Sequence, residues 1–298
     1  MMNNQSAPLI FGEVLYDCFP DGTRVLGGAP FNVAWHCQAF GLSPLLISRV
    51  GDDQMGEQIA LAMQNWGMDT SGLQFDKQHP TGIVDVAFNN GEPSYDIVEN
   101  SAWDFIDHTA LPSLDNSDVL YHGSLALRNT ISASALQYIK QMTSASVFVD
   151  INLRAPWWNN ALIEEIIEQG RWLKLNEEEL SLIVPHHATT ETRIDDLLST
   201  RLLNLLIVTR GEKGVIVASA DGNRVSVEPE RNLNVVDTVG AGDAFSSVML
   251  LAQYKAWPLQ IALNRAQAFA SAIVGIRGAT INDLAFYQPF VDGWQLKS

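Results

Sequence analysis

The sequence has few basic residues. Its 298 residues contain 18 lysines and arginines against 34 aspartates and glutamates, which gives a formal net charge of −16. A surface this acidic repels phosphate backbones and anionic headgroups, so we expect neither a nucleic acid nor a membrane as a partner. The two cysteines, Cys18 and Cys37, are too few for a disulfide framework and show no CxxC or metal-ligand spacing. They predict reduced thiols in a cytoplasmic protein.

Long apolar runs are also missing. The sequence contains no stretch of about 18 apolar residues, so we expect no membrane-spanning helix. The first residues lack a basic segment before their short apolar run and do not resemble a signal peptide. Apolar residues nevertheless make up 47% of the chain and include eight tryptophans and twelve phenylalanines. This composition excludes a disordered chain and is sufficient to fill a large core.

Short apolar runs alternate with longer amphipathic segments along the chain. We expect strands at 8–11, 45–50, 119–122, 147–150, 172–175 and 205–209, and helices at 31–40, 54–66, 132–142 and 160–169. This alternation predicts right-handed crossovers and an α/β fold with a mainly parallel sheet covered on both faces. Because no repeat or interdomain linker interrupts the pattern, we predict one domain over residues 1–298.

One segment departs from the α/β pattern. Residues 81–89 and 94–99 alternate with a period of two around an Asn-Gly pair at 90–91, which is a strong hairpin signal. Residues 12–26 could add further short strands. We therefore predict a small β-sheet lid formed by about 12–26 and 80–100, with an ordinary surface hairpin as the alternative.

The predicted hairpin has an apolar face. Val84, Val86 and Phe88 share it, while Asp85 and Ala87 lie on the other face. If the apolar face is exposed, a second copy of the chain would cover it, and this predicts a homodimer through the lid.

A glycine-rich turn near the C-terminus is the most informative segment. A β-like entry leads into Gly240-Ala241-Gly242 and then into a helical pattern. Small residues at a helix start leave unpaired backbone N–H groups at the positive end of the helix dipole, and these groups stabilise an anion. Asp243, in the first turn, either caps the helix or accepts a proton from a hydroxyl beside that anion.

Two common nucleotide-binding motifs do not fit this turn. A Walker A loop needs a Gly-Lys pair, and the chain contains none. A dinucleotide fingerprint needs a small residue where Phe245 stands and an acidic residue about 20 positions further on. Residues 244–282 contain neither aspartate nor glutamate, which argues against a Rossmann dehydrogenase.

Residues 237–245, Asp-Thr-Val-Gly-Ala-Gly-Asp-Ala-Phe, resemble the DTxGAGDxF signature of the PfkB, or ribokinase-like, sugar kinases. Residues 27–34 with Phe40-Gly41 resemble the family's N-terminal GGxxxNxA…LG segment. Residues 12–17, 80–82, 93–95 and 102–104 resemble the lid segments of bacterial fructokinases. The resemblance covers essentially the whole chain and implies a ribokinase-like three-layer fold with a small β-sheet lid.

The resemblance also implies catalytic roles. Asp243 matches the base that removes the proton from the sugar hydroxyl. The backbone amides of Gly240, Ala241 and Gly242 match the anion hole for the transferred phosphoryl group. This agrees with the chemistry of the residues, because phosphoryl transfer depends mainly on positioning and charge stabilisation. An aspartate of ordinary acidity is sufficient if it accepts the proton late.

The positions matching the family's sugar site lie in two segments: Asp17, Gly27, Gly28 and Asn32, and the DxNxR strand end with Asp150, Asn152 and Arg154. Carboxylates and amides bind paired hydroxyls, and glycines let a sugar ring approach the backbone. The alternatives are an exposed lid charge for Asp17, a helix cap for Asn32 and a structural ion pair for Arg154.

The positions matching the nucleotide site are Lys174, Thr209, Gly211, Gly214 and Gln267. Asn176 and Glu179 match the NxxE motif that organises Mg²⁺ and its waters, and the competing interpretation is an acidic helix start. Asp237 either supports a monovalent cation such as K⁺ or orders the turn. Nearby, residues 244–282 carry Lys255, Arg265 and Arg277 but no carboxylate, which favours an anionic nucleotide there.

The implied function is the ATP-dependent phosphorylation of a free sugar, with D-fructose as the first expectation. The alternatives are a kinase for 2-dehydro-3-deoxygluconate, ribose or a nucleoside, and a catalytically silent sugar-binding protein of the same fold. The lid has no arginine between Thr81 and Asp107, which argues against a keto acid. The presence of Asp243 argues against a silent binder, because a binder needs no base.

Overall fold

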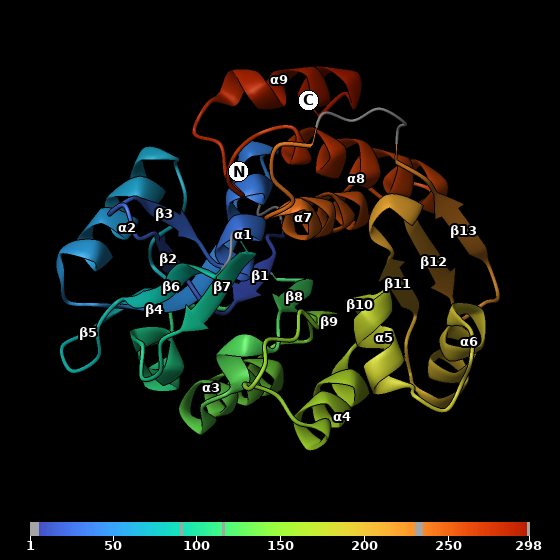
Figure 1. The fold of residues 1–298 in the computed structure, drawn as a ribbon, viewed down its shortest axis with the longest axis horizontal. Helices are drawn as coiled ribbons and strands as arrows, with labels where there is room; N and C mark the ends of the chain where they lie inside the picture. Colours follow the sequence, from blue (N-terminus) through green and yellow to red (C-terminus); the bar gives the residue numbers. More distant parts are fainter. Residues whose placement is uncertain (1–5, 90–91, 115–116, 230–234, 297–298) are drawn as a thin grey trace.

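The computed structural model describes residues 6–89, 92–114, 117–229 and 235–296, and a large twisted sheet forms its middle layer (Figure 1). The strands of this sheet are, in spatial order, β13 (Arg224–Val227), β12 (Val215–Ser219), β11 (Leu205–Thr209), β10 (Trp172–Asn176), β9 (Ser146–Asp150), β8 (Val119–His122), β1 (Leu9–Phe11), β4 (Leu45–Gly51) and β5 (Leu73–Asp76). All pairs from β5 to β11 are parallel, and β12 and β13 complete the edge in antiparallel orientation.

Helices cover both faces of the large sheet (Figure 1). One face packs against α1 (Ala29–Ala39), α2 (Gln54–Asn65), α7 (Ala241–Tyr254), α8 (Leu259–Val274) and α9 (Leu284–Gly293). The opposite face packs against α3 (Thr130–Met142), α4 (Asn160–Gln169), α5 (Glu177–Ile183) and α6 (Thr190–Thr200). The α/β class with a mainly parallel sheet covered on both faces is therefore confirmed.

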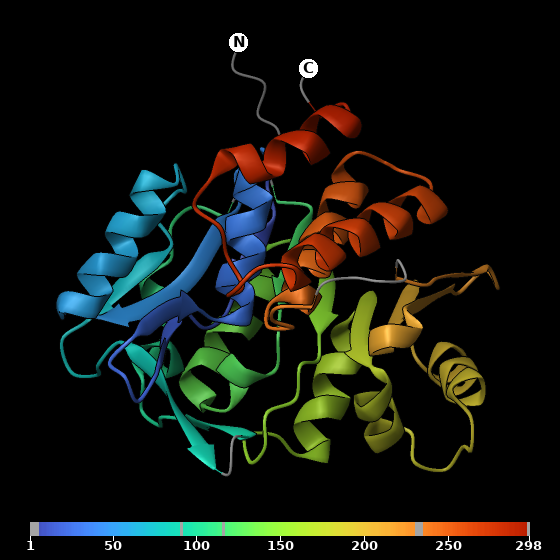
Figure 2. The same cartoon turned by 45° about the horizontal axis from the view of Figure 1, so that its top comes forward.

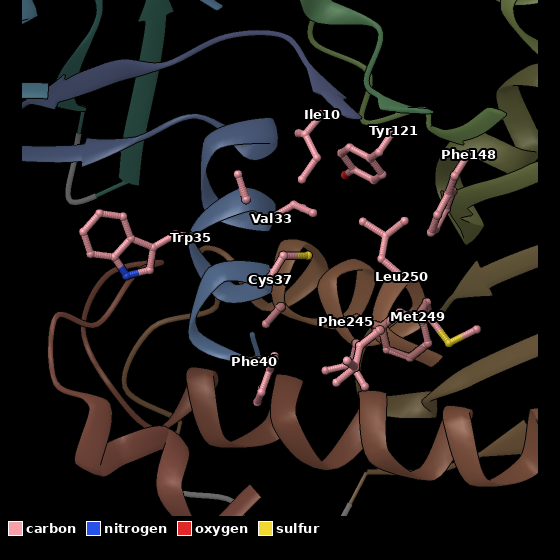
Figure 3. Close-up of a cluster of buried hydrophobic side chains, with 14 of the residues drawn as sticks. Ile10, Val33, Trp35, Cys37, Phe40, Tyr121, Phe148, Phe245, Met249 and Leu250 are labelled. Carbon is pink, nitrogen blue, oxygen red and sulfur yellow. The ribbon is translucent and has the colours of Figure 1, made fainter. Parts of the chain in front are cut away.

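The core is divided in two by the sheet. Successive side chains of a strand point to opposite faces, so Leu9 and Phe11 of β1 pack on the α3–α4 side while Ile10 packs on the α1–α7 side. Figure 3 shows the apolar cluster on the α1–α7 side of the sheet, in which Tyr121 and Phe148 of the sheet approach Leu250 of α7. Because the central strands are covered on both faces, they consist mainly of apolar residues, with buried exceptions such as Lys174 of β10 and His122 of β8.

A second, smaller sheet lies beside the first (Figure 2). Its order is β3 (Arg24–Gly27), β2 (Leu15–Cys18), β6 (Gly82–Asn89) and β7 (Glu92–Ile97). β2 and β6 are parallel, with Leu15 opposite Gly82, and the two outer pairs are antiparallel. Both segments expected in the lid therefore contribute strands, and the Asn-Gly turn at 90–91 lies outside the described residues.

The apolar face of the hairpin differs from the expectation. Val84 and Val86 are only 6% and 4% exposed in the single chain, so the prediction that this face meets water is wrong. The sheet turns the face inward, where Val84 packs with Ile97 and Trp103 in the core. The side chain of Phe88 lies outside the described residues. The argument for a dimer thus loses its basis, and the dimer itself stays a prediction.

Among the described residues, no helix is long and apolar enough to cross a membrane.

Candidate active site

The start of α7 is fixed by close backbone packing. Gly240, the N-cap, has a left-handed backbone with φ of +79°, and a Cβ at this position would lie 2.4 Å from the Cβ of Ala279. Only glycine accommodates both constraints. Asp237 orders the preceding turn, because its carboxylate accepts hydrogen bonds from the backbone N–H of Val239 (3.0 Å) and of Gly278 (3.1 Å). The helix therefore begins at Ala241.

Asp243 lies in the first turn of α7 but does not cap it. Its Oδ2 instead accepts a hydrogen bond from Nδ2 of Asn32, at 2.8 Å, and Asn32 projects from α1. Burial raises the pKa of Asp243 to about 6, the Asn32 hydrogen bond opposes this, and the charge of Asp150 adds to it. Asn32 does not cap its helix either, since the N-cap of α1 is Gly28.

A buried ion pair lies beneath Asp243. Nζ of Lys174 donates to Oδ2 of Asp150 at 2.6 Å, and the hydroxyls of Tyr121 and Ser246 donate to the same oxygen at 2.9 Å each. Lys174 also lies against the glycine turn, because a Cβ on Gly242 would be 3.3 Å from its Nζ. The network holds one ammonium group next to the backbone amides at the start of α7.

A cavity of about 470 Å³ opens above this network. Its wall contains the predicted residues Asp17, Gly28, Asn32, Asn152, Arg154, Lys174, Gly240, Gly242 and Asp243. Burial raises the pKa of Asp17 to about 6, with a further contribution from Asp237, so Asp17 is not a freely solvated lid charge. Carboxylates and amides dominate the polar part of the wall, which suits a ligand rich in hydroxyl groups.

Two residues predicted for the sugar site lie just outside the cavity wall. Asp150 is 4% exposed and lies in the buried network, where it holds Lys174. Gly27 lies next to the wall, since a Cβ there would be 3.6 Å from Oδ2 of Asp17 and 3.9 Å from Oδ1 of Asn32. Arg154 lines the cavity, is exposed, and makes no ion pair with another described residue; its Nη1 donates to the backbone oxygen of Leu153.

A second cavity, of about 360 Å³, lies on the other side of the glycine turn. Thr209, Gly211, Gly214 and Gln267 line it as predicted for the nucleotide, whereas Lys174 lies in the first cavity. Apolar side chains complete the wall, namely Val215, Val235, Phe245 and Val274. The two cavities share Thr238 and Gly242, so ligands in the two cavities would meet at the start of α7.

The predicted metal positions act as a helix cap. Asn176 and Glu179 form a reciprocal capping box at α5, in which each side chain accepts from the other residue's backbone N–H at 2.8 Å. The second oxygen of Glu179 accepts from the backbone N–H of Leu153 at 2.7 Å. Within the described ranges, no group of three His, Cys, Asp or Glu residues is arranged to hold a metal ion directly.

Several wall residues were not identified from the sequence. Glu13, Tyr95, Ile97 and Leu125 line the first cavity. Glu13 follows strand β1, and the carboxyl ends of parallel strands are where such sheets bind ligands, so its position carried a usable signal. Tyr95 of the lid sheet lies in the segment 93–95 that resembles the fructokinase lid, whereas no local pattern distinguishes Ile97 and Leu125 from core residues.

These features define a class: an α/β protein with two adjoining cavities that meet at the start of a helix. The model of the pfkB family of carbohydrate kinases matches residues 14–285. The chain belongs to this family of ATP-dependent sugar kinases, as the sequence motifs predicted.

Individual relatives agree with the family assignment. A fructokinase from Escherichia coli is 31% identical over 255 residues, which covers 81% of this chain and 82% of that protein. The structure of a fructokinase variant from Vibrio cholerae O395 with fructose, ADP and potassium bound has a TM-score of 0.80 at 25% identity, covering 95% of this chain and 98% of that one. A sugar kinase from Pyrococcus horikoshii in complex with ATP has a TM-score of 0.78 at 26% identity, covering 91% and 93%.

Proposed function

We propose that this chain transfers the γ-phosphoryl group of ATP to a hydroxyl of D-fructose, with Asp243 as the general base. The observation that carries the proposal is the position of Asp243, which faces the hydroxyl-binding cavity from the helix start shared with the second cavity. The names of the relatives support D-fructose as the acceptor, and the fructose and ADP bound to the Vibrio cholerae protein support the same pair of ligands.

In this mechanism the sugar occupies the first cavity and ATP the second. The sugar hydroxyl attacks the γ-phosphorus, a new O–P bond forms, and the bond from phosphorus to the bridging oxygen breaks, so that its electron pair leaves with ADP. Asp243 accepts the hydroxyl proton. The amides of the 240–242 turn and the ammonium of Lys174 offset the charge on the transferred group.

The acidity of Asp243 suits this role. A general base works best when its pKa is close to the working pH, and burial raises the pKa of this carboxyl to about 6. The base is therefore ionised at neutral pH and becomes protonated below about pH 6. We expect kcat/KM to fall at least tenfold per pH unit below this value, because Asp17 in the same cavity also has a pKa of about 6, and initial rates between pH 4.5 and 8 would measure the fall. A profile that is flat down to pH 4.5 would contradict the assignment.

Mg²⁺ would reach the site with the phosphates of ATP. Each oxygen of the Glu179 carboxylate already accepts one backbone hydrogen bond, so Asn176 and Glu179 fit a hydrated ion held through water better than direct ligands. When bound, Mg²⁺ supplies positive charge that neutralises the phosphates. For K⁺, both oxygens of Asp237 likewise accept backbone N–H groups, so we propose that this residue orders the turn.

The small sheet would act as a lid on a single kinase domain. Val84, Tyr95 and Ile97 from β6 and β7 form part of the sugar cavity's wall. Closure of this sheet would exclude water, which otherwise competes with the sugar as phosphoryl acceptor.

One observation favours a second candidate acceptor. Arg154 lines the first cavity and pairs with no carboxylate among the described residues, so its guanidinium could bind the carboxylate of a sugar acid such as 2-dehydro-3-deoxygluconate. Arg154 therefore weakens the argument against a keto-acid substrate, which was based on the lack of arginine in the lid.

A panel of acceptors separates these candidates. ADP release is measured with D-fructose, ribose, 2-dehydro-3-deoxygluconate and a nucleoside, and NMR identifies the phosphorylated hydroxyl of the product. We expect the highest kcat/KM with D-fructose, and Asp243→Asn serves as the control that should be slow with every acceptor. A higher kcat/KM with the sugar acid would replace D-fructose as the substrate. If no acceptor stimulates ADP release, the silent sugar-binding alternative is favoured.

A further inference from the structure

One carboxylate in the sugar cavity has no role in the mechanism described above. Glu13 follows strand β1, is 3% exposed and lines the first cavity. Its Oε2 is buried and accepts no hydrogen bond from any residue in the described part of the chain. Burying an unpaired carboxylate oxygen is costly, so proteins retain such groups where something other than stability favours them.

The backbone around Glu13 is built to place it. Gly12 has φ of +149°, and a Cβ there would lie 2.5 Å from Cγ of Pro30. Gly28 has φ of +109°, and a Cβ there would lie 2.6 Å from the backbone oxygen of Glu13. Both positions require glycine because any side chain would collide. These close contacts bring the end of β1 against the start of α1 and fix the origin of the Glu13 side chain.

Other acceptor oxygens near the cavity also lack hydrogen-bond donors from the protein. The amide nitrogen of Asn32 is committed to Asp243 at 2.8 Å, while its Oδ1 is buried and finds no donor within the described ranges. Oδ2 of Asp17 and Oδ1 of Asn32 both lie within 4 Å of the position that a Gly27 Cβ would occupy. Acceptor oxygens therefore gather on one part of the wall, and a ligand with several O–H donors would satisfy them.

We propose that Glu13 is a substrate-binding residue of this kinase, whose free Oε2 accepts a hydrogen bond from a hydroxyl of the acceptor sugar other than the one that is phosphorylated. The proposal rests on the proposed function and adds a specificity determinant to it. A site built to pair with a hydroxyl rejects an analogue that lacks it, because the protein group is then left buried and unpaired.

The electrostatics of the cavity agree with this role. Burial raises the pKa of Glu13 to about 7 and the charge of Asp243 adds to the effect, while a hydrogen bond from the residue's own backbone and the charges of Arg154 and Arg128 oppose it. A carboxyl group that is poorly solvated in the free protein gains more from an added donor than an exposed one does.

Two substitutions of Glu13 and one matched control test the proposal. Glu13→Gln keeps the shape but removes the charge, and Glu13→Met also removes the acceptor. The control is Ser48→Ala on β4. The Ser48 hydroxyl is likewise fully buried and unpartnered among the described residues, but Ser48 lines neither cavity. KM for sugar and for ATP, kcat and melting temperature are measured for all four proteins with the best acceptor of the panel.

We expect the KM for sugar to rise about 10- to 100-fold in the Glu13 variants, with the larger rise in Glu13→Met. The KM for ATP and kcat should stay within about threefold, because the hydrogen bond is present in the ground state as well as the transition state. The melting temperature should rise at pH 8 in Glu13→Met and Ser48→Ala, since each removes an unpaired buried polar atom, and to a smaller extent in Glu13→Gln, which removes only the buried charge. Ser48→Ala should leave both KM values unchanged.

Monodeoxy analogues of the same sugar identify the contact. In the wild type one analogue, lacking a hydroxyl that is not the phosphoryl acceptor, should lose about 10- to 100-fold in kcat/KM. The same analogue should lose little against Glu13→Met, because the variant has no acceptor to leave unpaired.

The outcomes separate this proposal from the proposed function. If the wild type phosphorylates no acceptor, both fail. If the wild type is active but the Glu13 variants keep the wild-type KM for sugar, only the role of Glu13 is overturned. A fall in melting temperature with an equal loss of kcat for all acceptors would also overturn it, because that pattern indicates a structural carboxylate. The role of Glu13 would also be overturned if each deoxy analogue lost as much kcat/KM with Glu13→Met as with the wild type.

Discussion

Helices α5 and α7 both carry a carboxylate at the third position of their first turn, and the two carboxylates have different surroundings. Glu179 of α5 accepts hydrogen bonds from the backbone N–H groups of Asn176 and Leu153. Asp243 of α7 accepts from the side chain of Asn32 and faces a cavity. Burial is the main influence on both groups and raises the pKa of each.

The difference originates at the N-cap residue. Asn176 has an extended backbone (φ −89°, ψ 171°) and a side chain that bonds to the backbone of Glu179, which completes a reciprocal capping box. Gly240 has no side chain and a left-handed backbone, and no side-chain cap forms at α7. Both oxygens of the Glu179 carboxylate therefore accept backbone hydrogen bonds within the fold, whereas the Asp243 carboxylate stays available to a ligand.

The largest expected effect is on turnover. Asp243→Asn preserves the hydrogen bond from Asn32, because an amide oxygen can accept it, but removes the base. We expect kcat to fall by about 10²- to 10⁴-fold with the KM for ATP little changed. Steady-state ADP release measures this. Asp17→Ala is the contrasting variant, since it should mainly raise the KM for sugar. Turnover of Asp243→Asn within tenfold of the wild type would show that the two carboxylates do not differ in this way.

The second expected effect is on stability at α5. Glu179→Ala removes the acceptor of two backbone N–H groups, those of Asn176 and Leu153. Leaving these two partly buried donors without an acceptor costs about 1–3 kcal/mol each, so we expect the free energy of unfolding to fall by about 2–6 kcal/mol. Urea titration followed by circular dichroism measures the change. A loss below about 0.5 kcal/mol, on the scale of ordinary surface substitutions, would mean that the two backbone hydrogen bonds of the carboxylate do not stabilise the fold.

The same contrast explains how far the sequence predicts this site. The glycine turn and Asp243 were predictable from local signals, because close backbone approach requires glycine and a helix start attracts a polar group. Asn32 was predicted only through the family resemblance. The predicted strands at 119–122 and 205–209 coincide with β8 and β11, since a strand buried on both faces must be continuously apolar.

Contacts between distant segments were not predictable. Asp150 was expected in the cavity wall, but the fold places it in a buried network with Tyr121, 29 positions away, and Ser246, 96 positions away. The NxxE spacing of Asn176 and Glu179 is equally compatible with a capping box and with a metal site. Local spacing therefore identified the residues but could not assign their partners, because partners are set by how the strands and helices pack.

The third expected effect is a gain of stability that depends on pH. Burial raises the pKa of Asp243 to about 6 in the folded state, whereas the unfolded value is about 3.9. The folded protein thus binds more protons between these values and loses stability as the pH rises through 6. Asp243→Asn removes this loss, so we expect it to raise the free energy of unfolding by about 1–3 kcal/mol at pH 8 and by nothing below pH 4.

Urea titrations of wild type and variant at pH 4, 6 and 8 measure this difference. Glu179→Gln is the matched substitution at α5. It should lower stability at pH 8, because the new amide nitrogen faces a backbone donor in place of a carboxylate oxygen, and this loss outweighs the gain from removing the buried charge. The comparison of the two helices thus predicts opposite signs for the same chemical change. If the two substitutions changed the free energy of unfolding in the same direction at pH 8, the comparison would be contradicted.

The smallest expected effect is on the cap itself. Asn176→Ala removes the side-chain oxygen that accepts from the backbone N–H of Glu179, and losing an N-cap acceptor costs about 1 kcal/mol. Asn176→Asp keeps an acceptor and should restore most of this loss. Because the two residues bond reciprocally, the double variant Asn176→Ala/Glu179→Ala should lose less than the sum of the single losses, by at least about 0.5 kcal/mol. Strictly additive losses of unfolding free energy would mean that the two hydrogen bonds form independently. The capping box would then not be what holds the Glu179 carboxylate against the backbone.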